Sequence, residues 1–161
     1  MTAAWHLPLP DQVAPLLRDL LGRQVSTAKA KGPMPSGAMV VATYVVDEGP
    51  LSALCVLDFQ LAAHVGAALM MMPAGVADES VRAKKLDETL LENAREVLNI
   101  GSRWFMPPNA PHVKMADVSV LQPGAAVPAP VAALMKAPPK SVAVEVTIAG
   151  YKGGRLTLCS R

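Results

Sequence analysis

The pattern of hydrophobic and polar positions along the chain predicts three helices and five strands. Apolar residues recur at helical spacing over 13–21, fill nearly every position of 61–72, and follow one face of 87–105. Apolar runs rich in β-branched residues predict strands at 39–46, 51–59, 115–121, 141–149 and 155–160. The segments 28–37 and 122–130 are rich in proline or glycine and predict loops, 78–85 is polar, and 131–136 has room for one helical turn.

The order of these elements indicates the fold class. The links between 39–46 and 51–59, and between 141–149 and 155–160, are short and turn-like, which favours antiparallel hairpins. Two helices follow one another between the first hairpin and the later strands. We therefore predict an α+β fold, with a mostly antiparallel sheet layered by helices and a long amphipathic helix. A length of 161 residues predicts one domain over 1–161, with 1–10 as a candidate disordered N-terminal segment.

Composition and charge narrow the class of protein. Fifteen basic and 13 acidic residues give a net charge of +2 without charged blocks, which argues against a nucleic-acid or anionic-membrane surface. The longest uncharged stretch, 59–77, is interrupted by Gln60, His64, Gly66 and Pro73, so we expect no membrane insertion. The first residues lack a secretory signal pattern. Cys55 and Cys159 lie in apolar runs and are predicted to be reduced interior thiols, so a cytoplasmic protein is expected.

The chain lacks the sequence patterns of self-contained catalytic sites. Its three histidines are far apart and none has metal-ligand spacing, so no metal site is predicted. His64 falls in the apolar helix and is predicted to be a packed residue. No phosphate-binding loop, nucleophile elbow, HExxH pair or CxxC motif occurs, and we expect no bound cofactor. Gly153 and Gly154 lie between two predicted strands, which favours a hairpin turn over a phosphate loop.

The helix predicted over 87–105 divides cleanly into an apolar and a polar face. With Asn99 at the origin of a wheel of about 100° per residue, six polar residues fall within about 60° of it: Glu88, Glu92, Arg95, Glu96, Ser102 and Arg103. Asn93 is the one polar residue on the apolar side, and we expect it to need a buried hydrogen-bond partner. From this pattern alone, a solvated helix face is the favoured interpretation.

One segment of this helix resembles a known motif. The sequence Glu96-Val97-Leu98-Asn99-Ile100-Gly101 resembles the ExxN helix of the CheX/CheC/FliY family of bacterial chemotaxis phosphatases. The surroundings extend the resemblance over roughly residues 10–160, since 39–59 resembles the family's preceding hairpin, 116–124 its following strand and proline, and 149–158 its closing hairpin. A single ExxN in a chain of this length is nearer CheX than the two-site CheC.

The resemblance implies a function, a partner and site residues. It implies a phosphatase that acts on a phosphorylated CheY-like response regulator, whose aspartyl phosphate is held with Mg²⁺ in the regulator itself. Asn99 would orient the attacking water, and Glu96 would pair with the lysine that lines the regulator's phosphorylation site. The resemblance also implies a homodimer in which a sheet edge is completed by the second subunit.

Two positions depart from the family pattern. Glu92 stands where the CheC-type pattern favours Asp or Ser, and Arg103 stands where the family commonly keeps Gly. Arg103 could crowd the incoming partner or clamp its acidic pocket and phosphoryl group. We expect Glu92, Arg95 and Arg103 to contact the partner. Two alternatives stay open: a catalytically weak or inactive CheC-like or flagellar-switch-like module that binds a response regulator, and a plain α+β domain whose ExxN is accidental.

Overall fold

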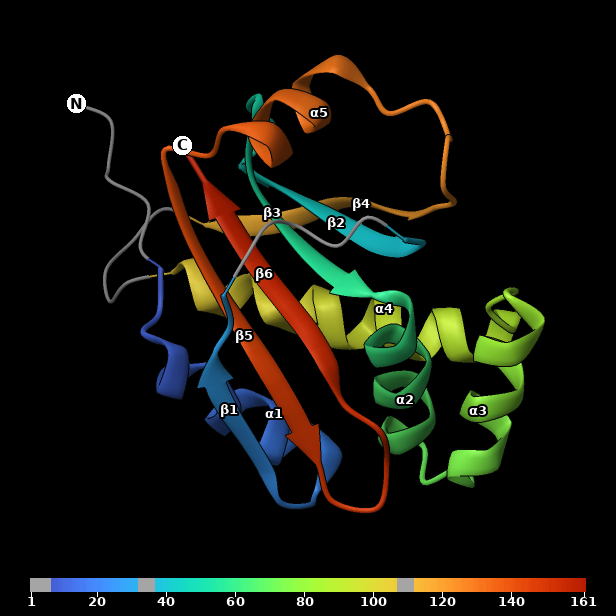
Figure 1. Cartoon of the computed structure of the whole chain (residues 1–161). Coiled ribbons are helices and arrows are strands. Elements are labelled where there is room, and N and C mark those ends of the chain that lie inside the picture. The colour runs from blue at the N-terminus through green and yellow to red at the C-terminus, as the bar shows by residue number, and fades with distance from the viewer. Residues whose placement is uncertain (1–6, 32–36, 107–111) are drawn as a thin grey trace.

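A six-stranded antiparallel sheet is the centre of the computed structural model, which describes residues 7–31, 37–106 and 112–161 (Figure 1). In space the strand order is β1-β5-β6-β3-β2-β4, so β1 and β4 are the two edges. The strand bounds are β1 Val25–Lys29, β2 Met39–Val46, β3 Leu51–Asp58, β4 Val113–Leu121, β5 Lys140–Ile148 and β6 Gly154–Ser160. The predicted α+β class with a mostly antiparallel sheet is confirmed.

The helices are divided unequally between the two faces of the sheet (Figure 1). The larger core lies between the sheet and three helices, α1, α2 and α4. The helix α3 packs against α2, and α5 lies over the opposite face. The helix bounds are η1 Pro10–Gln12, α1 Ala14–Leu21, α2 Phe59–Leu69, α3 Ala74–Ala83, α4 Glu88–Ile100, η2 Gly101–Phe105 and α5 Ala129–Lys136, where η marks a 3-10 helix.

The two cores explain the apolar segments of the sequence. Residues 61–68 of α2 are buried all round, because α2 contacts the sheet on one side and both α3 and α4 on the others. Cys55 belongs to the larger core and Cys159 to the smaller one under α5. Both are free, buried thiols, as predicted. Burial raises the pKa of Cys159 to about 11, so it stays an uncharged thiol at neutral pH.

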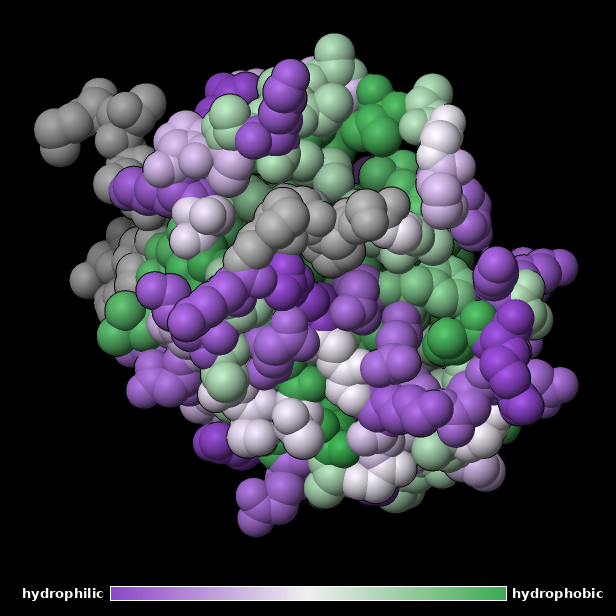
Figure 2. All heavy atoms as spheres, in the orientation of Figure 1, coloured by the Kyte–Doolittle hydropathy of each residue, from purple (hydrophilic) through white to green (hydrophobic). Residues whose placement is uncertain are grey.

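Figure 2 views the face of the sheet over which α5 lies. Hydrophilic side chains cross this face over β5 and β6, where Arg155 pairs with Glu145 at 3.1 Å, and hydrophobic side chains gather beside α5. The helix with the resemblance motif, α4, lies on the other face of the sheet.

Three elements differ from the sequence prediction. The strand β1 pairs with β5 although no strand was predicted there, and α3 occupies a region interpreted only as polar. The helix α5 has eight residues, which is longer than the single turn expected.

At the N-terminus, residues 1–6 lie outside the described part, whereas Leu7 packs against the larger core and the Pro10 carbonyl accepts a hydrogen bond from Thr27 at 2.7 Å. Within the described ranges, no helix is both long and apolar enough to cross a bilayer.

Candidate functional site

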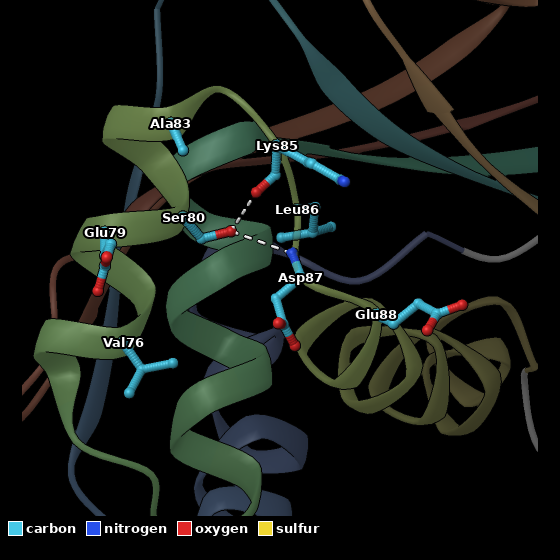
Figure 3. A pocket seen from close by; sticks show the side chains of 8 residues that line it. All are labelled: Val76, Glu79, Ser80, Ala83, Lys85, Leu86, Asp87 and Glu88. Carbon is cyan, nitrogen blue, oxygen red and sulfur yellow. Dashed lines mark hydrogen bonds between the residues drawn. The ribbon is translucent and has the colours of Figure 1, made fainter.

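A capped corner fixes the start of α4 (Figure 3). The Ser80 hydroxyl at the end of α3 donates to the Lys85 carbonyl at 2.6 Å and accepts from the Asp87 amide at 3.1 Å. The Asp87 carboxylate then accepts from the Thr89 amide at 2.8 Å, as an N-cap does. These three hydrogen bonds hold the connection between α3 and α4, and so they fix the direction in which α4 leaves.

The inner face of α4 is held close to α2. Asn93 donates from Nδ2 to the Gly66 carbonyl at 2.9 Å, which confirms that this asparagine needs a buried partner. A Cβ added at Gly66 would overlap the Leu90 carbonyl oxygen, so glycine permits the close approach of the two helices. With Leu90, Ala94, Val97 and Leu98 buried, the rotation of α4 about its axis is fixed.

The helix ends earlier than the sequence pattern predicts. The predicted helix 87–105 is α-helical only to Ile100, where the Gly101 amide donates to the Val97 carbonyl, and it continues as the 3-10 helix η2. A 3-10 helix turns about 120° per residue rather than 100°, so positions after Gly101 leave the predicted face. Ser102, predicted to be exposed, is therefore buried, whereas Arg103 remains exposed.

The outer face of α4 carries the predicted site residues. Glu92, Arg95, Glu96 and Asn99 are all exposed, and together with Met115 of β4 they line an open depression of about 410 Å³. Of the five residues predicted from the sequence, the structure brings these four together. Arg103 is exposed on η2 but does not line the depression.

The four polar side chains that line this depression are exposed and, among the described residues, have no bonded partner. Within the part of the chain that the structure describes, no side-chain hydrogen bond or ion pair engages Asn99, Glu92, Arg95 or Glu96. Two carboxylates and one guanidinium give the lining a formal charge of −1. Asn99 adds a neutral carboxamide that can donate and accept hydrogen bonds at the same time. The depression can therefore orient a polar molecule or pair with a charged surface.

A second polar cluster lies elsewhere and is fully engaged. His64 is completely buried on α2, its Nε2 lies 3.1 Å from Asp78 Oδ1, and its Nδ1 accepts from the Lys152 amide at 3.1 Å. The Lys152 ammonium also lies 3.1 Å from Asp78 Oδ1. Burial lowers the pKa of His64, an effect that Asp78 opposes. Both ring nitrogens are occupied by the protein, so the prediction of a packed histidine is confirmed.

A second depression, of about 610 Å³, lies between α3 and the start of α4 (Figure 3). Three carboxylates, one ammonium and several small or apolar side chains line it. The lining residues are Val76, Glu79, Ser80, Ala83, Lys85, Leu86, Asp87 and Glu88. The Ser80 hydroxyl in this depression is already bonded to the Lys85 carbonyl and the Asp87 amide. In the described residues no group of three or more His, Cys, Asp or Glu side chains is arranged to hold a metal ion.

Sequence reasoning missed two residues next to the depression. Met115 forms part of its wall from β4, and Tyr44 on β2 pairs with Met115 and donates from its hydroxyl to the Leu98 carbonyl at 2.6 Å. Both lie in segments correctly predicted as strands. Their proximity to Asn99 depends on strand pairing and helix packing, which local periodicity does not specify.

Comparison with known proteins supports the fold. No protein-family model and no curated protein sequence matches the chain. Among solved structures, FliY of Thermotoga maritima superposes with a TM-score of 0.56 at 19% identity, covering 93% of this chain and 83% of that one. The FliM middle domain from H. pylori gives 0.57 at 11% identity, covering 94% and 84%.

A third similar structure contains a bound partner. CheX of Borrelia burgdorferi, solved in complex with CheY, BeF3 and Mg²⁺, gives a TM-score of 0.54 at 12% identity, covering 94% of each chain. At these identities the likeness extends to the fold alone. The fold therefore occurs both in a CheY-bound protein and in FliY and FliM.

Proposed function

We propose that the chain is a CheX-like phosphatase that hydrolyses the aspartyl phosphate of a phosphorylated CheY-type response regulator. One observation carries the proposal: Asn99 is exposed, lines an open depression and is not bonded by any described side chain. Its position fits the role that the resemblance to the ExxN helix gives it. Asn93, on the same helix, differs from Asn99 because its side chain is bonded to the Gly66 carbonyl inside the protein.

The proposed reaction needs a positioned water rather than a strong base. An aspartyl phosphate is a reactive mixed anhydride. The water oxygen forms a bond to phosphorus while the bond between phosphorus and the carboxylate oxygen breaks, which releases inorganic phosphate and restores the aspartate. Asn99 accepts a hydrogen bond from the water through Oδ1 and donates from Nδ2 to a phosphoryl oxygen. Positioning of this kind lowers barriers by several kcal/mol, and a tenfold acceleration needs only about 1.4 kcal/mol.

The charged residues around Asn99 act in docking. Glu96 lies one turn before Asn99 and pairs with the lysine of the regulator's phosphorylation site. Glu92 and Arg95 contact the surrounding surface, and Arg103 extends toward the negatively charged phosphoryl group from η2. Mg²⁺ belongs to the regulator and not to this chain. Because response regulators of this class act in the cytoplasm, we expect the chain to act there too.

We further propose that two copies associate through the outer edge of β4. β4 terminates the sheet, and its outer side has no strand partner among the residues described. Such an edge can pair with a second copy by strand addition. Light scattering after size exclusion should give twice the chain mass of 16.9 kDa. The mass of a single chain at micromolar concentration would contradict the dimer and leave the site proposal unaffected.

A second candidate is a binding module without phosphatase activity. The observation that favours it is the similar TM-score of the FliM middle domain, 0.57 against 0.54 for CheX. FliM from H. pylori is also known in complex with FliG, in a structure that matches with a TM-score of 0.52. Glu92 and Arg103, the two departures from the family pattern, would then serve docking alone.

Phosphate release separates the two candidates. Each CheY-type regulator of the same organism is phosphorylated with acetyl phosphate, freed of excess donor, and followed with and without the protein. The phosphatase proposal predicts at least tenfold faster decay for one regulator, abolished by Asn99→Ala and retained by the matched variant Asn93→Ala. Binding without faster decay supports the module. Failure of every regulator either to bind or to decay faster would overturn both candidates.

A further inference from the structure

The carbonyl of Leu98, immediately before Asn99, is bonded from the sheet. The Tyr44 hydroxyl donates to it at 2.6 Å, across 54 positions of sequence. The last carbonyls of an α-helix lack regular intrahelical donors, and here the terminal α-type bond runs from the Gly101 amide to Val97. Tyr44 therefore satisfies the carbonyl that follows, at the point where α4 changes to η2.

Tyr44 is held rigidly enough to act on the helix. Its side chain is fully buried, and its ring lies 4.9 Å, centroid to centroid, from the ring of Phe105 in η2. Burial raises the pKa of Tyr44 well above its ordinary value, so the hydroxyl stays protonated and remains a donor throughout the usable pH range. The single residue thus contacts both the end of α4 and the 3-10 helix that follows.

The sheet is irregular on both sides of Tyr44. Its partner on β4 is Met115, while Thr43 pairs with Asp117, so β4 carries one extra residue at this level. On β3 its partner is Ala53, while Val45 pairs with Leu51, which leaves another extra residue. Bulges of this kind increase local twist and change the direction of side chains. They coincide here with Tyr44, whose hydroxyl bonds the end of α4.

From this arrangement we infer that Tyr44 is a positioning residue for Asn99. Through Leu98 it fixes the last turn of α4, and through its cross-strand pair with Met115 it fixes the opposite wall of the depression. The direction in which the Asn99 side chain leaves the helix is thereby set from the sheet. The inference rests on the proposed phosphatase function for its catalytic consequence, but the structural part stands by itself.

The variant Tyr44→Phe tests the inference because it removes the donor and keeps the ring. We expect amide hydrogen exchange to become at least tenfold faster from Asn99 to Phe105 and to stay unchanged over the first turns of α4. For dephosphorylation of the regulator we expect kcat to fall about tenfold while KM stays within twofold. The matched control, Asn93→Ala, removes a different bond to α4, from the Gly66 carbonyl, and should leave kcat of the folded protein unchanged.

The outcomes separate this inference from the proposed function. Unchanged exchange near Asn99 in Tyr44→Phe overturns the inference, whatever the enzyme does. Faster local exchange with unchanged kcat also overturns it when the wild type is active. If the wild type speeds the dephosphorylation of no regulator, the proposed function fails. The amide hydrogen exchange measurement alone then decides whether Tyr44 fixes the end of α4. An equal loss of kcat in Asn93→Ala would show a general effect of destabilisation and would contradict a specific role for Tyr44.

Discussion

The two faces of α4 use the same residue type in opposite ways. Asn93 faces inward and donates to the Gly66 carbonyl of α2, whereas Asn99 faces outward, and no described side chain bonds it. A buried polar group must find a partner inside the protein, since leaving it unpaired costs about 1–3 kcal/mol. An exposed carboxamide carries no such requirement and remains available to another molecule. The contrast shows that orientation, rather than residue type, separates a structural asparagine from a candidate site.

The same contrast holds for a buried histidine on α2. His64 is the residue type that most often acts as a general base near neutral pH. Its two ring nitrogens are occupied by Asp78 and the Lys152 amide, and the ring is completely buried. The buried histidine is therefore a common catalytic group that another molecule cannot reach. The outer face of α4 can be reached, and it carries carboxylates, a guanidinium and a carboxamide. That difference favours a mechanism based on docking and positioning.

The largest effect is expected at the closest contact of the inner face. In Gly66→Ala, the added Cβ would overlap the Leu90 carbonyl, so α2 and α4 must move apart. We expect the free energy of unfolding to fall by about 2–3 kcal/mol, measured by denaturant titration. The matched control is Gly75→Ala on α3, where an added Cβ meets nothing within 4 Å. This control should lie within about 1 kcal/mol of wild type, and an equal loss in both variants would refute the close-approach argument.

The paired asparagine variants come next. Asn93→Ala leaves the buried Gly66 carbonyl without its side-chain donor, and we expect the free energy of unfolding to fall by about 1–3 kcal/mol. Asn99→Ala removes an exposed side chain and should change stability by no more than about 0.5 kcal/mol. Thermal and denaturant unfolding of the two variants provide the measurement. A reversed order of stability would contradict the assignment of the two faces.

A smaller effect on the free energy of unfolding is expected from pH, through the polar cluster of His64, Asp78 and Lys152. Because burial lowers the pKa of His64, the unfolded chain takes up a proton below its ordinary value of 6.5 before the folded chain does. Stability should therefore be complete above pH 6.5 and should decline as the pH falls below it. The Asp78 carboxylate offsets part of this effect, while Lys152 adds to it. In His64→Gln this part of the decline between pH 7 and 5 should disappear, and an unchanged pH profile would count against the cluster.

The smallest effect is expected at the charged rim of the outer face. Glu96→Ala should raise KM for the regulator about two- to fivefold with little change in kcat, since exposed ion pairs contribute less than about 1 kcal/mol. Glu88→Ala is the matched control, because Glu88 is exposed on the same helix but does not line the depression with Asn99. Steady-state phosphate release at two salt concentrations gives the comparison. Equal effects of the two variants would indicate general charge steering in place of a specific contact.

Much of the fold was predictable because its elements have strong local patterns. The hairpins and α4 have clear periodicity, and the exposure of Glu92, Arg95, Glu96 and Asn99 follows from that helix alone. β1 was missed because it is a five-residue edge strand with a single fully buried position, which leaves no alternating hydrophobic pattern. Its extended conformation depends on pairing with β5. α3 was missed because Gly75 and its polar residues weaken the helical pattern, and packing on α2 compensates.

The remaining features of the site depend on non-local geometry. Ser102 was wrongly placed on the exposed face, because the change from α4 to a 3-10 helix cannot be read from periodicity. Met115 reaches the depression, and Tyr44 reaches the end of α4, only through the β2–β4 register and its irregularity. The sequence therefore predicts which side chains face outward on one helix, while the neighbouring wall and its support require the folded sheet.

The most direct test follows the Asn99 side-chain amide itself during docking. The side-chain NH2 resonances of a ¹⁵N-labelled sample are recorded while a CheY-type regulator, charged with Mg²⁺ and beryllofluoride as a phosphoryl mimic, is added. The account predicts that the Asn99 pair shifts or broadens strongly, that the Asn93 pair does not, and that uncharged regulator has a much weaker effect. Tight binding of the charged regulator with an unperturbed Asn99 pair would contradict the claim that this carboxamide enters the phosphorylation site.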